Sequence, residues 1–404
     1  MDERPDWSIR RAYGVPERQA MTETLYSRPV KSAARVLAVF VLVALILFVM
    51  TRFLLPRILG TDSEPAEPSA SLVGGALPSL AGLVWLNSGP LPPDSLRGHP
   101  AVIVLWSDTD PECLRELPDI QTWHQAYGRY GVRVIGVHEP DFAFAADSTV
   151  PASVVRRLGL SFPIALDSDY HLRAALGAPA DGPRVILVDT AGIVLHVESG
   201  RGHLANVEGR LREQVRRLRP DLDFPADPAT SGTRPDAPAD DATSHVVHLG
   251  VARVREGPLV GSPPGQAQIF TAQFRFQVEG KPNVPYPVGL WTPTAEGIIA
   301  GRGGAETFVA LRYDAGALWA VMSPPRGETV RVWVLRDEKW PAATELGDDV
   351  RRDGRGAAFI EVDEPRLYEI FHAAPGEHVA KLSPEVPGLT LHALIVEPPK
   401  AAPN

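Results

Sequence analysis

The sequence has very little cysteine and no excess of positive charge, and each shortage excludes a class of protein. Cys113 is the one cysteine among 404 residues, so no disulfide can form within the chain and its domains depend on the burial of apolar side chains. The formal net charge of −9 argues against a nucleic-acid partner, because a phosphate-binding surface needs clustered lysine and arginine. The 11 histidines are scattered without metal-ligand spacing, so we expect no metal and no cofactor.

One long apolar run is present near the N-terminus. Residues 36–50 contain no polar side chain and the run continues to Leu55, which gives roughly the 20 residues that a helix needs to cross a bilayer. We therefore predict a single transmembrane helix over residues 36–55, which anchors the chain through side chains that include Val36, Leu42, Leu45, Phe48 and Met50. The alternative is a cleaved signal peptide, whose charged region would here exceed 30 residues and whose apolar run is usually only about 7–15 residues.

The charges on either side of this run predict its orientation. Seven lysines and arginines precede the run, and only Arg52 and Arg57 follow it closely, so the positive-inside rule places residues 1–35 in the cytoplasm. Everything after the run then lies in the periplasm. We expect a single-pass protein of a bacterial inner membrane.

Two stretches rich in proline, serine, alanine and acidic residues divide the rest of the chain. Residues 56–75 are interpreted as a tether and residues 219–244 as a linker, because neither has an apolar period. They separate one domain at 76–218 from a second at 245–398.

The pattern of the first of these domains is that of an α/β fold. Residues 101–106 form a continuous apolar run that predicts a buried strand, and apolar side chains then recur at steps of three and four from Leu114 to Tyr127, as in a helix. A second buried strand is predicted at 132–138, and later patterns complete the order β-α-β-α-β-β-α. This order predicts a thioredoxin-type α/β domain, with a kink of the first helix at Pro118.

The second domain shows short strands of period two separated by glycine and proline, as in "FRFQV" and "RVWVL". Such a pattern predicts an all-β sandwich of the jelly-roll kind. Trp319 and Trp333 fall within these strands, so we expect them to pack in the core.

Several strings carry a resemblance to a known family. They are "WLNSGPLPPDSLRGHPAVIVLW", "CLRELPDIQTWHQAYGRYGVRVIGVHEPDFAFAAD", "RLGLSFPIALDSDY" and "RLYEIFHAAPGEHVAKL", with "VIGVHEPDFAF" the most discriminating. On these strings, the stretch from Trp85 to about Leu218 resembles the thioredoxin-like domain of the TlpA and DipZ group of extracytoplasmic thiol-disulfide proteins. The C-terminal third resembles the β-sandwich that follows it in DipZ-type proteins.

The resemblance implies a redox site that is degenerate in this chain. The family has a Cys-x-x-Cys motif after a strand that contains tryptophan, with a cis-proline opposite it. Trp106 and Cys113 match the tryptophan and the second cysteine, Pro183 matches the cis-proline, and Asp110 stands where the attacking cysteine would be. Asp110 cannot attack sulfur, and as an N-cap it would favour the helix start. Its charge is expected to raise the pKa of Cys113, the family's resolving and less exposed thiol.

Other residues with reactive or binding side chains do not indicate a definite functional site. His138 and Glu139 end a strand beside the site, where an acid-base pair competes with a purely structural role. Glu112, Glu116 and Asp119 are interpreted as a solvated acidic helix face. Four tryptophans of the second domain invite a sugar-stacking interpretation, and core packing is the alternative: Trp291, Trp319, Trp333 and Trp340.

Three functions remain open from the sequence. Because the attacking cysteine is absent, we expect a non-catalytic, membrane-anchored scaffold that stabilises a bacterial membrane complex, of respiratory or photosynthetic type, through other membrane-protein subunits. The first alternative is a thiol-disulfide oxidoreductase that uses Cys113 alone. The second is an envelope glycan binder that acts through the β-sandwich. Fold by itself does not decide among them.

Overall fold

The computed structural model describes residues 72–92, 94–177, 183–199, 203–220, 244–271, 280–314, 316–372, 374 and 376–397. The predicted cytoplasmic segment, the predicted transmembrane helix, most of the tether and almost all of the linker lie outside these residues. Within them, no helix combines the length and the apolar character that a bilayer span requires. The prediction of a membrane anchor at 36–55 therefore stays a prediction.

The first half of the described chain, residues 72–220, forms a six-stranded mixed sheet with helices, which we call the α/β domain. The strands lie in the order β1-β4-β3-β2-β5-β6. The central strands β2, β3 and β4 are parallel, and β1, β5 and β6 run antiparallel to their neighbours. Their bounds are β1 Val84–Leu86, β2 Ala101–Trp106, β3 Arg133–His138, β4 Ile164–Leu166, β5 Arg184–Val188 and β6 Val194–Ser199. The predicted strands at 101–106 and 132–138 are confirmed.

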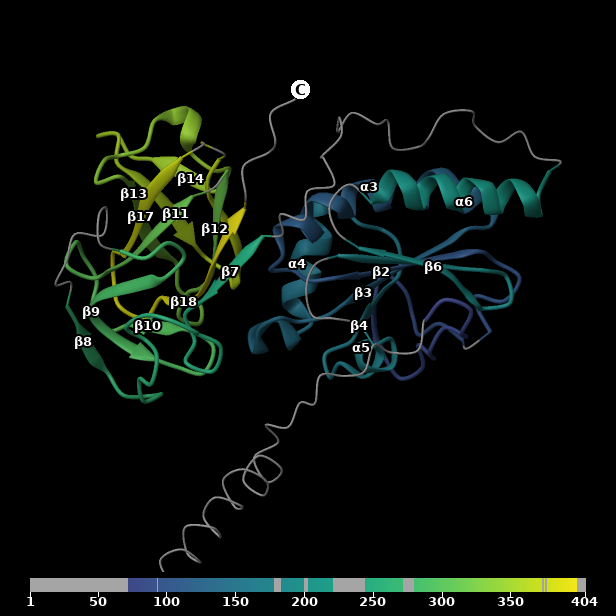
Figure 1. Cartoon of the computed structure of the whole chain (residues 1–404), viewed down its shortest axis with the longest axis horizontal. Coiled ribbons are helices and arrows are strands. Elements are labelled where there is room, and N and C mark those ends of the chain that lie inside the picture. Colours follow the sequence, from purple (N-terminus) through teal and green to yellow (C-terminus); the bar gives the residue numbers. More distant parts are fainter. Residues whose placement is uncertain are drawn as a thin grey trace, which may run out of the picture. The chain divides into compact units, whose positions relative to one another are not determined.

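Helices cover both faces of this sheet, as Figure 1 shows. Apolar side chains of α3, α4 and α6 pack against one face, which includes Val102, Val104 and Trp106 of β2. The opposite face carries Ile103 and Leu105 and is covered by α5 and by the segment before β1. The helices are α3 Pro111–Tyr127, α4 Thr149–Leu158, α5 His171–Ala175 and α6 Leu204–Leu218, with short 3-10 turns at Gly128–Tyr130 and Ala143–Ala146. Helix α3 runs unbroken through Pro118.

The second half, residues 244–397, consists of strands and turns, which we call the β domain. Twelve strands among its described residues form one hydrogen-bonded order, β14-β15-β13-β17-β11-β9-β10-β18-β12-β16, with β7 beside β18 and β8 beside β9. Every pair of these strands is antiparallel. The bounds are β7 His245–His248, β8 Gln268–Phe270, β9 Pro285–Pro293, β10 Ile298–Ala300, β11 Phe308–Asp314, β12 Ala317–Ser323, β13 Val330–Arg336, β14 Val350–Arg352, β15 Ala358–Val362, β16 Arg366–Phe371, β17 Glu377–Pro384 and β18 Thr390–Glu397, with a 3-10 turn at Ala343–Glu345.

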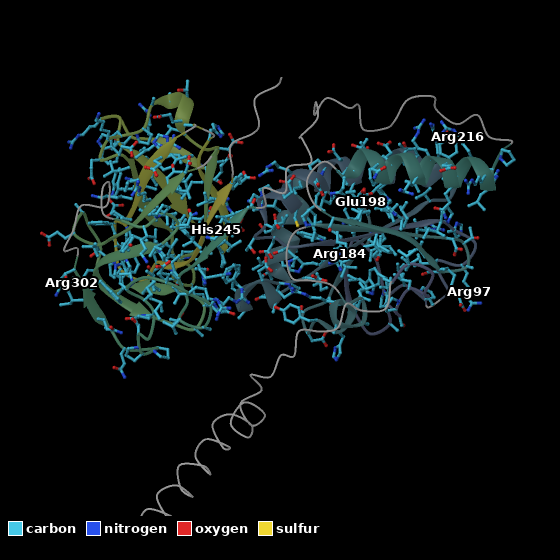
Figure 2. All side chains as sticks on the ribbon, viewed as in Figure 1. Arg97, Arg184, Glu198, Arg216, His245 and Arg302 are labelled. Carbon is cyan, nitrogen blue, oxygen red and sulfur yellow. The ribbon has the colours of Figure 1, made fainter. Side chains whose placement is uncertain are left out.

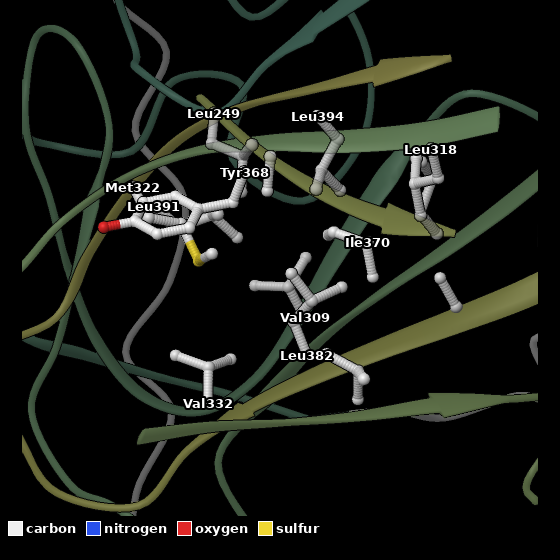
Figure 3. Packing of buried hydrophobic residues seen from close by; sticks show 14 of the residues in the cluster. Leu249, Val309, Leu318, Met322, Val332, Tyr368, Ile370, Leu382, Leu391 and Leu394 are labelled. Carbon is white, nitrogen blue, oxygen red and sulfur yellow. The ribbon is translucent and has the colours of Figure 1, made fainter. Parts of the chain in front are cut away.

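The two ends of this strand order share one apolar core. Val309, Val332 and Leu382 come from β11, β13 and β17, and they pack in the same cluster as Leu318 and Leu394 from β12 and β18. Figure 3 shows these side chains between the strands that carry them. The order therefore folds over on itself and buries one face of each half, as expected for packed β layers.

The tryptophans do not all face the core as we expected. In β13, the valines at 330, 332 and 334 point into the core and Trp333 points out. Trp319 also lies outside the main core, but it is half-buried and packs against a second apolar cluster; Trp291 is fully buried in the main core. The prediction of core packing is wrong for Trp333, because a period of two says that alternate residues share a face without saying which set faces inward.

Two strands of the β domain are apolar on both faces. All but the first residue of β18 are buried, and in β12 five of seven residues are buried without alternation. Strand β13, by contrast, alternates strictly between buried and half-buried residues. A strand with buried side chains on both faces requires a cover on each side of its sheet. The main core supplies one cover for β12 and β18, so something else must supply the second.

Gly136 of β3 is a position where the α/β core has no spare room. A Cβ atom there would lie 3.0 Å from Phe162, 3.1 Å from Ile164 and 3.2 Å from Trp106. We therefore predict that Gly136→Ala destabilises the chain by about 1–3 kcal/mol through overpacking. Gly209→Ala is the matched control, because a Cβ atom on that exposed residue of α6 meets nothing within 4 Å; it should stabilise by about 0.5–1 kcal/mol.

Urea unfolding of the full chain, followed by tryptophan fluorescence, measures both effects. Equal stability of the Gly136→Ala variant and the unmodified chain would show that the packing between β3 and β4 is looser than these distances indicate.

Candidate functional site

The candidate site begins where β2 gives way to α3. Strand β2 ends at Trp106, and Pro111 begins the helix at a position that suits its fixed φ angle and missing N–H. Asp110 is the N-cap, in an extended conformation, and its Oδ1 accepts hydrogen bonds from the backbone N–H groups of Glu112 at 2.7 Å and Cys113 at 3.3 Å. The predicted capping role of Asp110 is confirmed.

Cys113 lies in the first turn of α3 with its side chain in the apolar core. Its exposed fraction is 1%, and it packs in the same cluster as Trp106 and Leu117. The backbone N–H of Ser107 donates to its Sγ over 3.5 Å. An amide donor of this kind, together with the positive end of the helix dipole, favours the thiolate.

Two stronger effects oppose ionisation of this thiol. Burial raises the pKa of Cys113 well above its usual range, and the nearby carboxylates of Asp110, Glu116 and Asp141 raise it further, while the hydrogen bond from Ser107 lowers it. The sequence predicted the effect of Asp110. The larger effect of burial follows from the packing of α3 on the sheet.

The pKa of the capping residue, Asp110, is also shifted. Burial raises the pKa of Asp110 to about 6, against the lowering effect of the two amide hydrogen bonds it accepts, and the neighbouring charge of Asp141 adds to the rise. Asp110 therefore changes its charge in the mildly acidic range, beside the thiol.

A polar network surrounds the turn between β2 and α3. Asp141 accepts hydrogen bonds from the hydroxyls of Ser107 at 2.6 Å and Thr109 at 2.9 Å through one carboxylate oxygen, Oδ2. Burial raises the pKa of Asp141, which these two hydrogen bonds lower in part. The network ties the turn to the segment after β3 and fixes the position from which α3 starts.

Beneath this turn lies a buried histidine–aspartate pair that the sequence did not predict. His138 Nε2 lies 2.8 Å from Asp108 Oδ1, and both side chains are almost completely buried. The ring of His138 meets Trp106 edge to face, with centroids 4.8 Å apart. His138 is thus paired with Asp108 in the turn, and the acid-base pair suggested for it with Glu139 is not formed.

Glu139 contacts α5, which covers the opposite face of the sheet, and Pro183 lies at the start of β5. Glu139 Oε2 lies 3.8 Å from the Arg173 guanidinium, and burial raises the pKa of Glu139 to about 7, while Arg173 and Arg184 lower it. Pro183 is buried and directly precedes β5. Figure 2 shows Arg184, the next residue, inside the α/β domain and Arg97 at its surface. Gly182 lies outside the described residues, so the cis conformation of Pro183 stays a prediction.

Sequence reasoning missed several members of the site. Asp108, Asp141, Ser107 and Thr109 join it through the turn and the segment after β3, and the polar string "SDTD" was the available signal. The prediction of a solvated acidic helix face is wrong for Glu116. This side chain is buried, and His203 Nδ1 lies 3.6 Å from one of its carboxylate oxygens. Among the described residues, no three histidine, cysteine, aspartate or glutamate side chains come together as metal ligands.

Residues 74–211 match the Redoxin family, and residues 247–395 match the family described as "Thioredoxin like C-terminal domain". The protein DipZ of Mycobacterium tuberculosis is 30% identical over 272 residues, which cover 66% of this chain and 37% of DipZ. SUPPRESSOR OF QUENCHING 1, a chloroplastic protein of Arabidopsis thaliana, is 28% identical over 127 residues, or 31% of this chain and 12% of that one.

Among solved structures, the chain is similar to a secreted Mycobacterium tuberculosis disulfide oxidoreductase. The identity is 22% and the TM-score 0.27, and the match covers 35% of this chain and 96% of the other. The chain spans little more than a third of the length of DipZ.

These matches correct the function predicted from the sequence. The prediction of a non-catalytic scaffold is wrong, because the α/β domain matches Redoxin and the match to DipZ extends over two thirds of the chain. The loss of one cysteine had been taken as the loss of redox chemistry. The remaining thiol, however, still occupies the first turn of α3, with an amide donor on its sulfur. The chain has a thioredoxin-like α/β domain followed by a β-rich C-terminal domain.

The ionisation of Cys113 can be tested through its capping residue. In Asp110→Asn the amide oxygen keeps a cap while the charge is lost, so the pKa of Cys113 should fall and stay above its ordinary value because burial persists. The measurement is the rate of alkylation by iodoacetamide as a function of pH, followed by mass spectrometry of the full chain.

Asp94→Asn removes an equal charge from an exposed pair with Arg97 and serves as the control, with no shift expected. A profile that is identical for Asp110→Asn and the unmodified chain would show that Asp110 does not act on the thiol.

Proposed function

The chain is a thioredoxin-like protein of the TlpA/DipZ type, and from this premise we propose that it carries out thiol–disulfide exchange through Cys113 alone. The observation that carries the proposal is the place of the thiol. Cys113 lies in the first turn of α3, behind the Asp110 cap, with the Ser107 amide directed at its sulfur. With no second cysteine in the sequence, the disulfide that it forms is a mixed disulfide with another molecule.

The exchange proceeds in two steps that conserve atoms and electrons. The Cys113 thiolate attacks one sulfur of a small disulfide; a bond forms between the two sulfurs, and the other half of the disulfide leaves as a thiolate. An external thiol, also as its thiolate, then attacks the sulfur bound to Cys113 and releases the Cys113 thiolate. The sum is the exchange of one thiol group in a disulfide for another, with the chain regenerated and no net oxidation.

The surroundings of the thiol determine how fast this chemistry is. The amide of Ser107 and the helix start stabilise the thiolate, whereas burial and the Asp110 carboxylate destabilise it. The second effect dominates, so little thiolate is present at neutral pH. We propose that the exchange accelerates as the pH rises and that it requires a transient opening of the first turn of α3.

We also propose that this chemistry takes place outside the cytoplasm, on a chain anchored in the membrane. Support comes from the apolar run at 36–55 and from the excess of lysine and arginine before it. A periplasmic location would expose the site to disulfides, which are scarce in the cytosol.

Mixed-disulfide formation tests the proposed exchange. The reduced full chain, incubated with glutathione disulfide at pH 8 to 9, should gain one glutathione by mass, and Cys113→Ser should gain none. Added dithiothreitol should remove the adduct. If the unmodified chain stays unmodified even after hours at this pH, Cys113 is not an exchange thiol.

Restoring the attacking cysteine tests how far the site retains the geometry of its relatives. In Asp110→Cys the new thiol lies three residues before Cys113, at the start of the same helix, where a thiolate is stabilised. We expect an internal disulfide and a gain of insulin-reducing activity with dithiothreitol as reductant. The double variant Asp110→Cys with Cys113→Ser is the control and should lack turnover. If the two thiols never form a disulfide, the turn no longer places residues 110 and 113 as a Cys-x-x-Cys site requires.

A further inference from the structure

We propose that the β domain controls the exposure of Cys113 by holding the first turn of α3 in place. The inference rests on the proposed exchange function in one respect, since it concerns the same thiol. Contacts between the two domains determine how often the thiol becomes accessible, whichever reaction the thiol then undergoes.

The contact surface on the β domain is the second apolar face of β12, β16 and β18. Cross-strand register places Val321 of β12 opposite Leu367 of β16 and Ala393 of β18, and it places Trp319 opposite Ile395. Residues paired directly across a sheet share a face. These five side chains therefore form one apolar patch, on the side of the sheet away from the main core.

The α/β domain supplies the missing cover for this patch. Phe142 and Phe144, from the segment after β3, pack in one cluster with Val321, Leu367 and Ile395. Their rings are stacked on each other with centroids 5.7 Å apart, and both contact the ring of His392 on β18. Leu114, the residue after Cys113, belongs to the same cluster.

An ion pair fixes the next residue of the helix. The guanidinium of Arg115 binds the carboxylate of Glu397 at the end of β18, and Glu397 also accepts a hydrogen bond from Trp319 Nε1 at 2.9 Å. Glu397 is buried, so the pair is shielded from solvent. The carboxylates of Glu397 and Glu112 raise the pKa of Arg115 against the lowering effect of its burial.

Two hydrogen bonds at the margin of the patch complete the contact. The backbone N–H of Ala143 donates to Glu296 over 2.9 Å, and the hydroxyl of Ser153 donates to Glu364 over 2.8 Å. Arg253 also lies over the ring of Phe142. The contact thus has an apolar centre and a polar rim, as protein interfaces generally do.

The position of the contact couples it to the thiol. Cys113 is buried in the core of the α/β domain, so a reagent reaches its sulfur only when the first turn of α3 moves away from the sheet. That turn is held from within by the Asp110 cap and from outside by Leu114 and Arg115, which contact the β domain. Opening the turn must break these contacts, and a local opening costs the free energy of the contacts it breaks. The β domain therefore lowers the population of the reactive state.

Two variants release the contact without touching the thiol or its cap. Glu397→Gln removes the charge that binds Arg115, and Phe144→Ser removes apolar cover from the patch at a half-buried position of the 3-10 turn after β3. The matched control is Glu361→Gln on β15, at the other end of the strand order, where the same chemical change falls in an ion pair with Arg351. All are made in the full chain.

The readouts are the rate of iodoacetamide alkylation of Cys113 at a fixed pH and hydrogen–deuterium exchange of the peptide 107–118. We expect Glu397→Gln and Phe144→Ser each to raise the alkylation rate about tenfold, because the rate follows the population of the open turn. Amide exchange in the peptide should rise in parallel, and Glu361→Gln should change neither.

Unchanged alkylation in both variants would overturn the proposal, as would faster amide exchange without faster alkylation. The proposed exchange function fails by a different result. If alkylation accelerates as expected but glutathione disulfide still leaves no adduct, the control of exposure stands and the exchange chemistry does not.

Discussion

The two hydrogen bonds from the amides of Glu112 and Cys113 to the Asp110 carboxylate set the state of the whole site. They start α3 at a fixed point, and the apolar side of that helix then carries the thiol into the core with Leu117 and Ile120. The same carboxylate that stabilises the helix start disfavours a thiolate one turn away. Stability of the helix and reactivity of the thiol are therefore opposed through one side chain.

The turn before α3 is held by several further polar contacts. Asp141, Ser107 and Thr109 exchange hydrogen bonds within a few residues of the cap, and Asp108 is paired with His138 in the interior. Buried carboxylates are costly unless they are hydrogen-bonded or paired. Because Asp141 and His138 find these partners in the turn, displacement of the turn would leave both of them without those hydrogen bonds at once. This interdependence favours a site that opens rarely and as a unit.

Much of the α/β domain could be predicted from the sequence, since its buried strands and its long helix leave strong periodic signals. The strand at 101–106, the helix from Pro111 to Tyr127 and the cap at Asp110 follow from residue pattern and capping chemistry alone. The partners of the site could not be predicted. Asp141 reaches the turn from a segment about thirty residues later, and Asp108 and His138 meet only because β2 and β3 are adjacent and parallel. The spacing of these residues along the sequence does not indicate that they meet in the fold.

The β domain shows a second limit of prediction from the sequence. A period of two predicted its strands, but it did not reveal that Trp333 points outward or that β18 is buried on both faces. The signal was present in the string "LHALIV", which does not alternate. A strand without alternation predicts a second covering layer, and here that layer is supplied by Phe142, Phe144 and Leu114 of the other domain.

The single sulfur has a consequence for what the chain can carry. A pair of cysteines stores two electrons when it is reduced and releases them when it closes into a disulfide, so it functions as a reservoir of reducing equivalents. With Asp110 in place of the partner, Cys113 has no such reservoir. In the proposed exchange it holds one sulfur-bearing group at a time and passes it on, and the electrons of each transfer come from the disulfide and the thiol that react with it. Such a chain would carry groups and store no reducing equivalents, and it could be loaded only where disulfides are present.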